Sequence, residues 1–299
     1  MRWLELSVKV HPEAVDAVAE VFHQYGTGGV AIEQAVQGDS EGEERAAYLG
    51  MPVIKAYLPV TGDTSGQERR IDEALWHLRA FDLSPLGPLE RREIDEEDWA
   101  NSWKEHFHPL RVGRVVIKPS WRDWERTEAE IIVELDPGMA FGTGLHPTTQ
   151  LMLSALQDRV QPGMRVLDLG TGSGILALAA AKLGATVTAT DTSEVAVQVA
   201  RENIEINGLP GQIEVIHGSI DAVRGQTYDL VLANIIASVL IDLAVPLATS
   251  LAPGAELLGS GIIEERADDV LTAFSTAGLD LADQCQDGDW WLLVARRRA

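Results

Sequence analysis

Apolar and polar positions change their spacing several times along the first 94 residues, which predicts a small domain of alternating strands and helices. Residues 2–10 alternate apolar and polar side chains, as a half-buried strand does. From His11 to about Tyr25, apolar side chains recur at helical spacing. The same pattern predicts a second helix over 68–81 and strands over 30–36, 51–60 and 86–94. The resulting order, βαββαβ, is typical of a ferredoxin-like α+β domain.

Residues 95–108 form a separate segment with a different pattern. Trp99, Trp103 and Phe107 fall four residues apart, which places them on one face of a predicted helix with an acidic beginning. This helix could simply pack on a core, or it could connect and clamp two domains; the two interpretations are compatible. We therefore expect a first domain over 1–94, a connecting helix over 95–108 and a second domain over 109–299.

In the second domain, predicted strands alternate with predicted helices. The helices begin near residue 151 and cover 174–183, 195–207, 239–251 and 264–277. The strands cover 165–169, 186–190, 213–217, 230–233, 255–259 and 290–295. This alternation predicts an α/β fold with a doubly wound, mostly parallel, Rossmann-like sheet.

The strongest chemical signal is the run Asp168-Leu-Gly-Thr-Gly-Ser-Gly174, in which a buried strand leads into three glycines and then a helix. Gly170 and Gly172 allow the backbone to turn sharply and to approach a ligand closely. Asp191 ends the next strand, where its carboxylate can accept hydrogen bonds from both ribose hydroxyls of a nucleoside. The pattern predicts a cofactor that contains a nucleoside, since a plain strand-to-helix turn needs only one glycine.

Two further residues favour S-adenosylmethionine over a nicotinamide cofactor. Asp168 lies two residues before the glycines, where it would repel a pyrophosphate and attract the cationic amine of a methionine. Asn234 ends a central strand, so its amide is expected to face the ligand crevice and hold an amine against the methyl group.

A second glycine-rich stretch, residues 136–149, precedes these motifs and is expected to form a lid. Phe141 could cover the sulfonium in a cation–π contact, and the hydroxyls of Thr148 and Thr149 begin the following helix beside the methionine end. An ordinary irregular loop is the simpler alternative. His146 is a candidate base, although a structural histidine that packs before Pro147 is the favoured interpretation.

These runs together closely resemble the ribosomal protein L11 methyltransferase family. The resemblance rests on Asp136-Pro-Gly-Met-Ala-Phe-Gly-Thr-Gly-Leu-His-Pro-Thr-Thr149, on the glycine run, on Asn234-Ile-Ile-Ala237 and on the tryptophan-rich segment before Pro109. It implies a class I methyltransferase that transfers methyl groups to lysine side chains and the N-terminal amine of a ribosomal protein. It places cofactor contacts on Thr149, Gly170, Asp191 and Asn234, with Phe141 and Gly172 beside them, and implies no metal ion. Ser238-Val239-Leu240 departs from the proline and leucine that many members carry there, which affects the expected slot for the amine.

Charge and composition narrow the range of partners. The net charge of −22 is divided equally between residues 1–108 and 109–299, so both halves should repel nucleic acid and attract a basic protein, although solubility alone could explain the acidity. Cys285 is the single cysteine and no apolar leader or membrane span is visible, which predicts a cytoplasmic protein.

The sequence thus predicts an S-adenosylmethionine-dependent N-methyltransferase acting on a basic ribosomal protein. The alternatives are an N-methyltransferase for another protein, an RNA or a small molecule, a binding factor that only shares the fold, and a nicotinamide oxidoreductase. The absence of an Asn-Pro-Pro-Tyr run at Asn234 argues against planar nitrogens as targets, the intact glycines argue against a binding factor, and Asp168 argues against the oxidoreductase.

Overall fold

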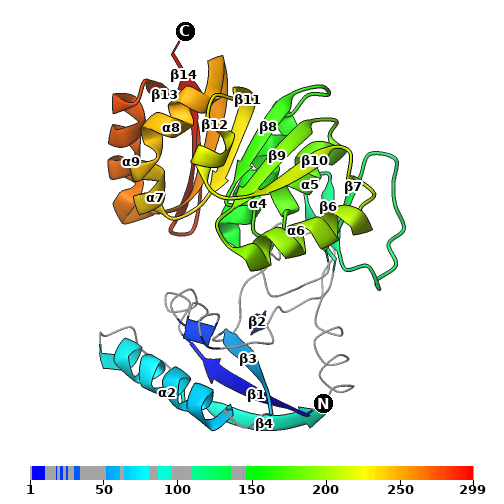
Figure 1. Ribbon diagram of the computed structural model, residues 1–299, viewed down its shortest axis with the longest axis vertical. Helices are drawn as coiled ribbons and strands as arrows, with labels where there is room; N and C mark the ends of the chain where they lie inside the picture. The colour runs from blue at the N-terminus through cyan, green and yellow to red at the C-terminus, as the bar shows by residue number, and fades with distance from the viewer. Residues whose placement is uncertain are drawn as a thin grey trace. The chain divides into compact units, whose positions relative to one another are not determined.

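The computed structural model describes residues 2–10, 18, 21–22, 25, 30–33, 52–60, 64–80, 87–95, 109–135, 144 and 146–298. The chain divides into two compact units, residues 1–107 and 108–299, shown in Figure 1. The segment 96–108, where a connecting helix is predicted, lies outside the described residues, so that helix stays a prediction.

The first unit contains a four-stranded antiparallel sheet in the order β2-β3-β1-β4. Its elements are β1 (Arg2–Lys9), β2 (Val30–Glu33), β3 (Val53–Pro59), α2 (Thr64–Ala80) and β4 (Glu90–Asp95). The first predicted helix is described only at four residues, all of them helical: Val18, Val21, Phe22 and Tyr25. This strand order is that of the predicted ferredoxin-like domain, which is confirmed.

The core of this unit forms where the sheet meets the helices. Alternate residues of the strands point to one face of the sheet, because side chains in a strand alternate in direction. Ile71 and Leu75, one turn apart on α2, pack against that face. The fully buried strand side chains are Leu6, Val8, Ile54, Ala56 and Leu58.

The second unit contains a seven-stranded sheet in the order β10-β9-β8-β11-β12-β14-β13. All its strands are parallel to one another except β14, which runs antiparallel to both neighbours. The predicted doubly wound, Rossmann-like sheet is therefore confirmed. The strands are β8 (Arg165–Leu169), β9 (Thr186–Asp191), β10 (Ile213–His217), β11 (Tyr228–Asn234), β12 (Leu251–Ile263), β13 (Leu279–Asp287) and β14 (Trp290–Arg297).

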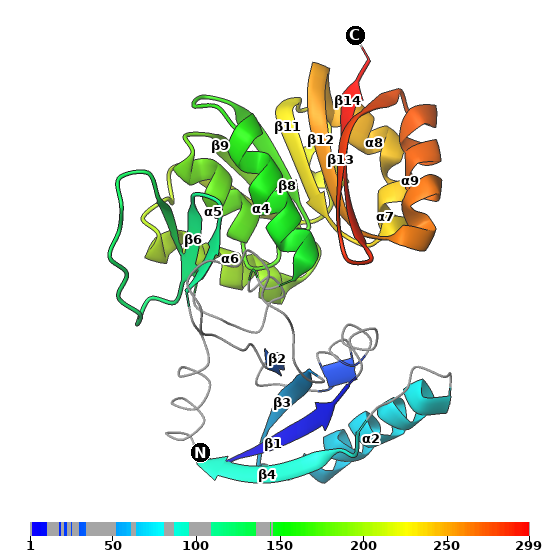
Figure 2. The same ribbon diagram turned by 180° about the vertical axis from the view of Figure 1, so that it is seen from behind.

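Helices pack on both faces of this sheet, as Figures 1 and 2 show from opposite sides. One face carries α4 (Pro147–Arg159), α5 (Ile175–Lys182) and α6 (Glu194–Ile206). The other face carries α7 (Ala237–Asp242), α8 (Ala244–Ser250) and α9 (Glu264–Thr276), with the short 3-10 helix η2 (Ile220–Val223). No helix in the described part of the chain is long and apolar enough to cross a membrane.

One prediction about an individual element was wrong, and one small sheet was not predicted. The helix expected over 239–251 is divided into α7 and α8 at Leu243. Pro246 lies in the first turn of α8, where its missing N–H does no harm, whereas inside one long helix it would remove a hydrogen bond. The small sheet of β5 (Leu110–Val112), β6 (Val115–Lys118) and β7 (Ile131–Glu134) was not predicted.

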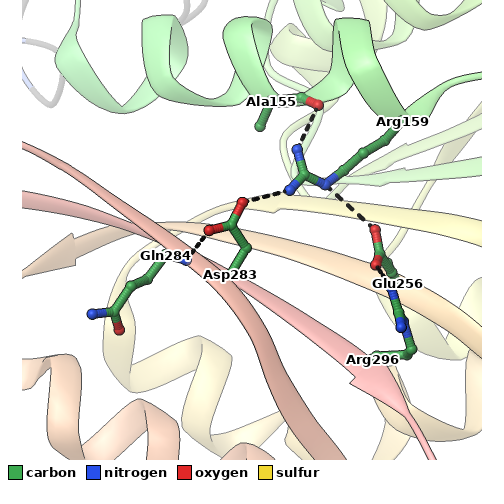
Figure 3. Close-up of polar contacts among 6 residues, drawn as sticks. All are labelled: Ala155, Arg159, Glu256, Asp283, Gln284 and Arg296. Carbon is green, nitrogen blue, oxygen red and sulfur yellow. Dashed lines mark hydrogen bonds and ion pairs between the residues drawn. The ribbon is translucent and has the colours of Figure 1, made fainter.

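The helix α4 is tied to the sheet at its C-terminal end. Figure 3 shows the guanidinium of Arg159 between two carboxylates, Asp283 of β13 at 2.8 Å and Glu256 of β12 at 3.4 Å. The same guanidinium donates to the Ala155 carbonyl, and Arg296 of β14 pairs with Glu256 at 2.6 Å. Because the side chain of Arg159 is only 22 % exposed, water screens these pairs less than it screens surface pairs. The anchor fixes the direction of α4 and so places its first residues.

Candidate cofactor site

Three neighbouring parallel strands end at one edge of the sheet, and polar residues follow each of them. β8 lies between β9 and β11, and the chain continues from β8 to β9 on one side and later reaches β11 on the other. The order of strands therefore reverses between β8 and β11, which is where open α/β sheets bind ligands. The glycine loop follows β8, Asp191 ends β9 and Asn234 ends β11.

The glycine loop after β8 is held by backbone hydrogen bonds to β9. The amides of Gly170 and Thr171 both donate to the Thr190 carbonyl, at 2.8 and 3.0 Å. Gly170 has φ 73°, and a Cβ there would lie 2.5 Å from Cγ2 of Ile235. Gly172 and Gly174 also have positive φ, a conformation that favours glycine. The loop therefore requires its glycines, which present backbone rather than side chains at this edge of the sheet.

Asp191 closes the loop with its carboxylate. One oxygen, Oδ2, accepts from the Gly172 amide at 2.9 Å, and Oδ1 accepts from the Ser193 amide at 2.9 Å. These bonds fix the orientation of a half-buried carboxylate beside the glycines. Each oxygen keeps a second lone pair, so the group can accept the two hydroxyls of a ribose.

Asp168 is buried under the loop and is only partly satisfied. Its Oδ2 accepts from the Thr171 hydroxyl at 2.6 Å and from the Ala177 amide at 3.2 Å. Its Oδ1 is buried with no hydrogen-bond partner among the described residues. Burial, partly offset by those two bonds, raises the pKa of Asp168 from 3.8 to about 6. A buried carboxylate with one unsatisfied oxygen fits a cationic ligand group such as the amine of a methionine.

Asn234, at the end of β11, and Thr149, at the start of α4, meet although they lie far apart in sequence. Nδ2 of Asn234 lies 3.4 Å from the hydroxyl of Thr149, which is 1 % exposed in the first turn of α4. Because the amide nitrogen makes this contact, the amide oxygen is the atom that can accept a hydrogen bond from an amine. The role of this oxygen toward the target amine stays a prediction.

His146 caps α4, and the favoured structural interpretation of this residue is confirmed. Its Nδ1 accepts from the Thr148 amide at 3.3 Å and lies 2.7 Å from the Thr148 hydroxyl. Its ring meets Trp290 edge to face, with centroids 4.7 Å apart. The cap and the packing against β14 account for the histidine, which therefore positions the start of α4.

The structure thus brings five predicted site residues to one edge of the sheet: Thr149, Gly170, Gly172, Asp191 and Asn234. Phe141, the sixth, lies outside the described residues, so its contact with a sulfonium stays a prediction. No group of three or more histidine, cysteine, aspartate or glutamate side chains suited to a metal ion occurs in the described part of the chain.

Sequence reasoning missed the residues that hold Asn234 in place. The Ile235 amide donates to the Ser260 carbonyl of β12 at 3.1 Å, and a Cβ on Gly261 would lie 2.5 Å from the Ile235 carbonyl oxygen. The sequence did contain an indication of this contact. Gly259-Ser-Gly261 places two glycines at the end of a predicted strand, which is typical of a close approach between two backbone segments.

Comparisons with known proteins show which family the chain resembles. A family model described as "Ribosomal protein L11 methyltransferase (PrmA)" matches residues 2–298. A ribosomal protein L11 methyltransferase from Chloroflexus aurantiacus is 44 % identical over 323 residues, covering 99 % of this chain and 98 % of that protein. Another, from Pelotomaculum thermopropionicum, is 44 % identical over 312 residues and covers 100 % of both chains.

A solved structure gives the same result for the fold. The crystal structure of a ribosomal protein L11 methylase from Lactobacillus delbrueckii subsp. bulgaricus superposes with a TM-score of 0.61 at 34 % identity. The match covers 64 % of this chain and 100 % of that one.

Proposed function

The chain belongs to the ribosomal protein L11 methyltransferase family, a family of S-adenosylmethionine-dependent protein methyltransferases, and from this premise we propose that it methylates lysine side-chain amines and the N-terminal amine of ribosomal protein L11. The observation that carries the proposal is the meeting of Asp191, the glycine loop and Asn234 at one sheet edge. That edge offers a ribose acceptor and an amine acceptor on either side of β8.

Each site residue has a proposed role toward the cofactor. Asp191 accepts the ribose hydroxyls, and Gly170 and Gly172 allow the nucleoside to approach the backbone. Asp168 receives the methionine amine, and Thr149 lies beside the methionine end. Phe141 covers the sulfonium from the lid.

For the reaction to proceed, the chain must align the amine nitrogen with the methyl group of the cofactor, and the amine must be neutral. The bound cofactor supplies a methyl group on a cationic sulfur, ready for displacement. Asn234 then orients the nitrogen in line with that methyl group, and orientation of this kind can supply roughly 7–11 kcal/mol of barrier reduction. A lysine has a reference pKa of about 10.4, and positive charge close to it favours the neutral form that attacks.

The partner is proposed to be a basic protein rather than a nucleic acid. With a net charge of −22, the chain attracts cationic surfaces and repels phosphates. Residues 1–94 are proposed to recognise the ribosomal protein, because every cofactor motif lies after residue 135. The reaction is proposed to take place in the cytoplasm.

Two measurements test this function. Calorimetric titration with S-adenosylmethionine and with NADH should show binding of the first only, and NADH binding alone would refute the cofactor assignment. Incubation with methyl-labelled cofactor should label ribosomal protein L11 and leave an unrelated basic protein of similar size unlabelled. Equal labelling of both proteins would instead favour a less selective N-methyltransferase.

A further inference from the structure

Ile236 is a large apolar side chain that the fold leaves in solvent beside the proposed amine site. It is 65 % exposed, more than any other large apolar side chain in the part of the chain that the structure describes. It lies two residues after Asn234, directly before α7, with extended backbone at φ −60° and ψ 146°. Burial of an exposed isoleucine side chain lowers the free energy. A ligand with an apolar surface would therefore bind favourably against Ile236.

The neighbouring residue, Ile235, is held inside the fold, in contrast to Ile236. The amide of Ile235 donates to the Ser260 carbonyl, and its side chain fills the space that a Cβ on Gly170 would need. Gly261 makes room for the Ile235 carbonyl on the β12 side. Ile235 is therefore held between the glycine loop and β12, whereas the side chain of the next residue, Ile236, remains exposed.

The distance from Asn234 suits the stem of a lysine. Two residues span at most about 7 Å, so Ile236 lies within the length of a lysine stem from Asn234. Lysine stems pack readily along apolar surfaces while the amine stays in a polar environment. An N-terminal α-amine is attached directly to the backbone and has no such stem.

We propose that Ile236 is a specificity-determining residue that packs against the aliphatic stem of a target lysine and so favours lysine over α-amine substrates. This inference rests on the proposed function, because it concerns the substrate of the same site. Ile236 is assigned no contact with the cofactor.

The experiment compares Ile236→Ala and Ile236→Leu with a matched control, Val245→Ala. Val245 is a β-branched residue on α8 with 60 % exposure, which matches Ile236 closely. Ribosomal protein L11 is the substrate, and mass spectrometry resolves methylation at each lysine and at the N-terminus. We expect Ile236→Ala to lower kcat/KM at lysine about tenfold, mainly through KM, since loss of apolar contact in a binding site weakens selection by about that factor.

The same variant should leave the α-amine rate and the affinity for S-adenosylmethionine unchanged. Ile236→Leu should restore lysine methylation, and Val245→Ala should match the unaltered chain at every site. A purely structural role would lower both rates together, so equal loss at lysine and α-amine would overturn the inference, as would no loss at either. If the unaltered chain transferred no methyl group to ribosomal protein L11, the proposed function would fail, and this inference with it.

Discussion

Replacing Asp168 with asparagine should make the cofactor-free protein more stable at pH 8. Burial raises the pKa of Asp168 from 3.8 to about 6, so the folded state disfavours its ionised form. A raised carboxyl pKa leaves stability intact below about pH 4 and lowers it as the pH rises through 6. The asparagine oxygen can still accept from Thr171 and Ala177, while a neutral amide costs less to bury than a carboxylate.

The size of the expected gain in stability follows from the change in the pKa of Asp168 on folding. A change of about two pKa units corresponds to about 3 kcal/mol at pH 8, since one unit is worth about 1.36 kcal/mol. An amide N–H buried at the position of Oδ1 would offset part of this, which leaves a gain of about 1–2 kcal/mol. For a unit of this size, the melting temperature should rise by about 2–8 °C.

The assay is thermal unfolding of the unaltered chain and of Asp168→Asn between pH 5 and pH 8, without and with S-adenosylmethionine. Asp268→Asn, at an exposed position of α9, is the control and should shift nothing. At pH 5 the gain should fall to about half of its value at pH 8, because the penalty builds up between the unfolded and the folded pKa of Asp168. Saturating cofactor should stabilise the unaltered chain more than the variant. An unchanged melting temperature at pH 8, or the same gain at pH 5 and pH 8, would refute the account of Asp168.

Three further predictions concern the site and the division into units. Asp191→Ala should weaken S-adenosylmethionine binding about ten- to a hundredfold because charged hydrogen bonds are lost; calorimetry checks this, and unchanged affinity would remove Asp191 from the site. Gly172→Arg should abolish cofactor binding, whereas Gly211→Arg, where nothing lies within 4 Å of an added Cβ, should bind normally; binding by both would move the site elsewhere. A chain shortened to start near Ile94 should fold, as circular dichroism can verify, and bind cofactor, yet fail to methylate intact ribosomal protein L11; full activity of that folded chain would contradict a recognition role for residues 1–94.

Much of the second unit could be predicted because strand and helix patterns alternate along it, and because β8 and β11 are largely buried and apolar. β8, β9 and β10 begin and end within a residue of the predicted positions, and the glycine loop, Asp191 and Asn234 follow from the same strand ends. The contact between Thr149 and Asn234 could not be predicted from the sequence, because it depends on how α4 crosses the sheet. That crossing is fixed by Arg159 and its two carboxylates, which are separated from it by roughly a third of the chain in sequence.

β13 was missed for a physical reason. Of its nine residues only Leu279 is buried, and the others are exposed and largely polar, so no alternation of apolar side chains marks a strand. Its structure comes from hydrogen bonds to β14, which residue patterns cannot reveal. The sheet of β5, β6 and β7 was missed because its strands are three or four residues long, too short for a period to show.

The placement of β14 between β12 and β13 has a consequence for how the protein is made. β13 pairs with no other strand in the described sheet, so it must wait until residues 290–297 have been synthesised. The strands that carry the glycine loop, Asp191 and Asn234 precede β13 and can associate earlier, since nascent domains fold from the N-terminal side. Asp283, which holds Arg159, therefore reaches its place only after residues 290–297 have been synthesised. If synthesis stopped within residues 279–289, the strands of the proposed nucleoside site could already be paired. The ion pair between Asp283 and Arg159, which anchors α4 to the sheet, would not yet have formed.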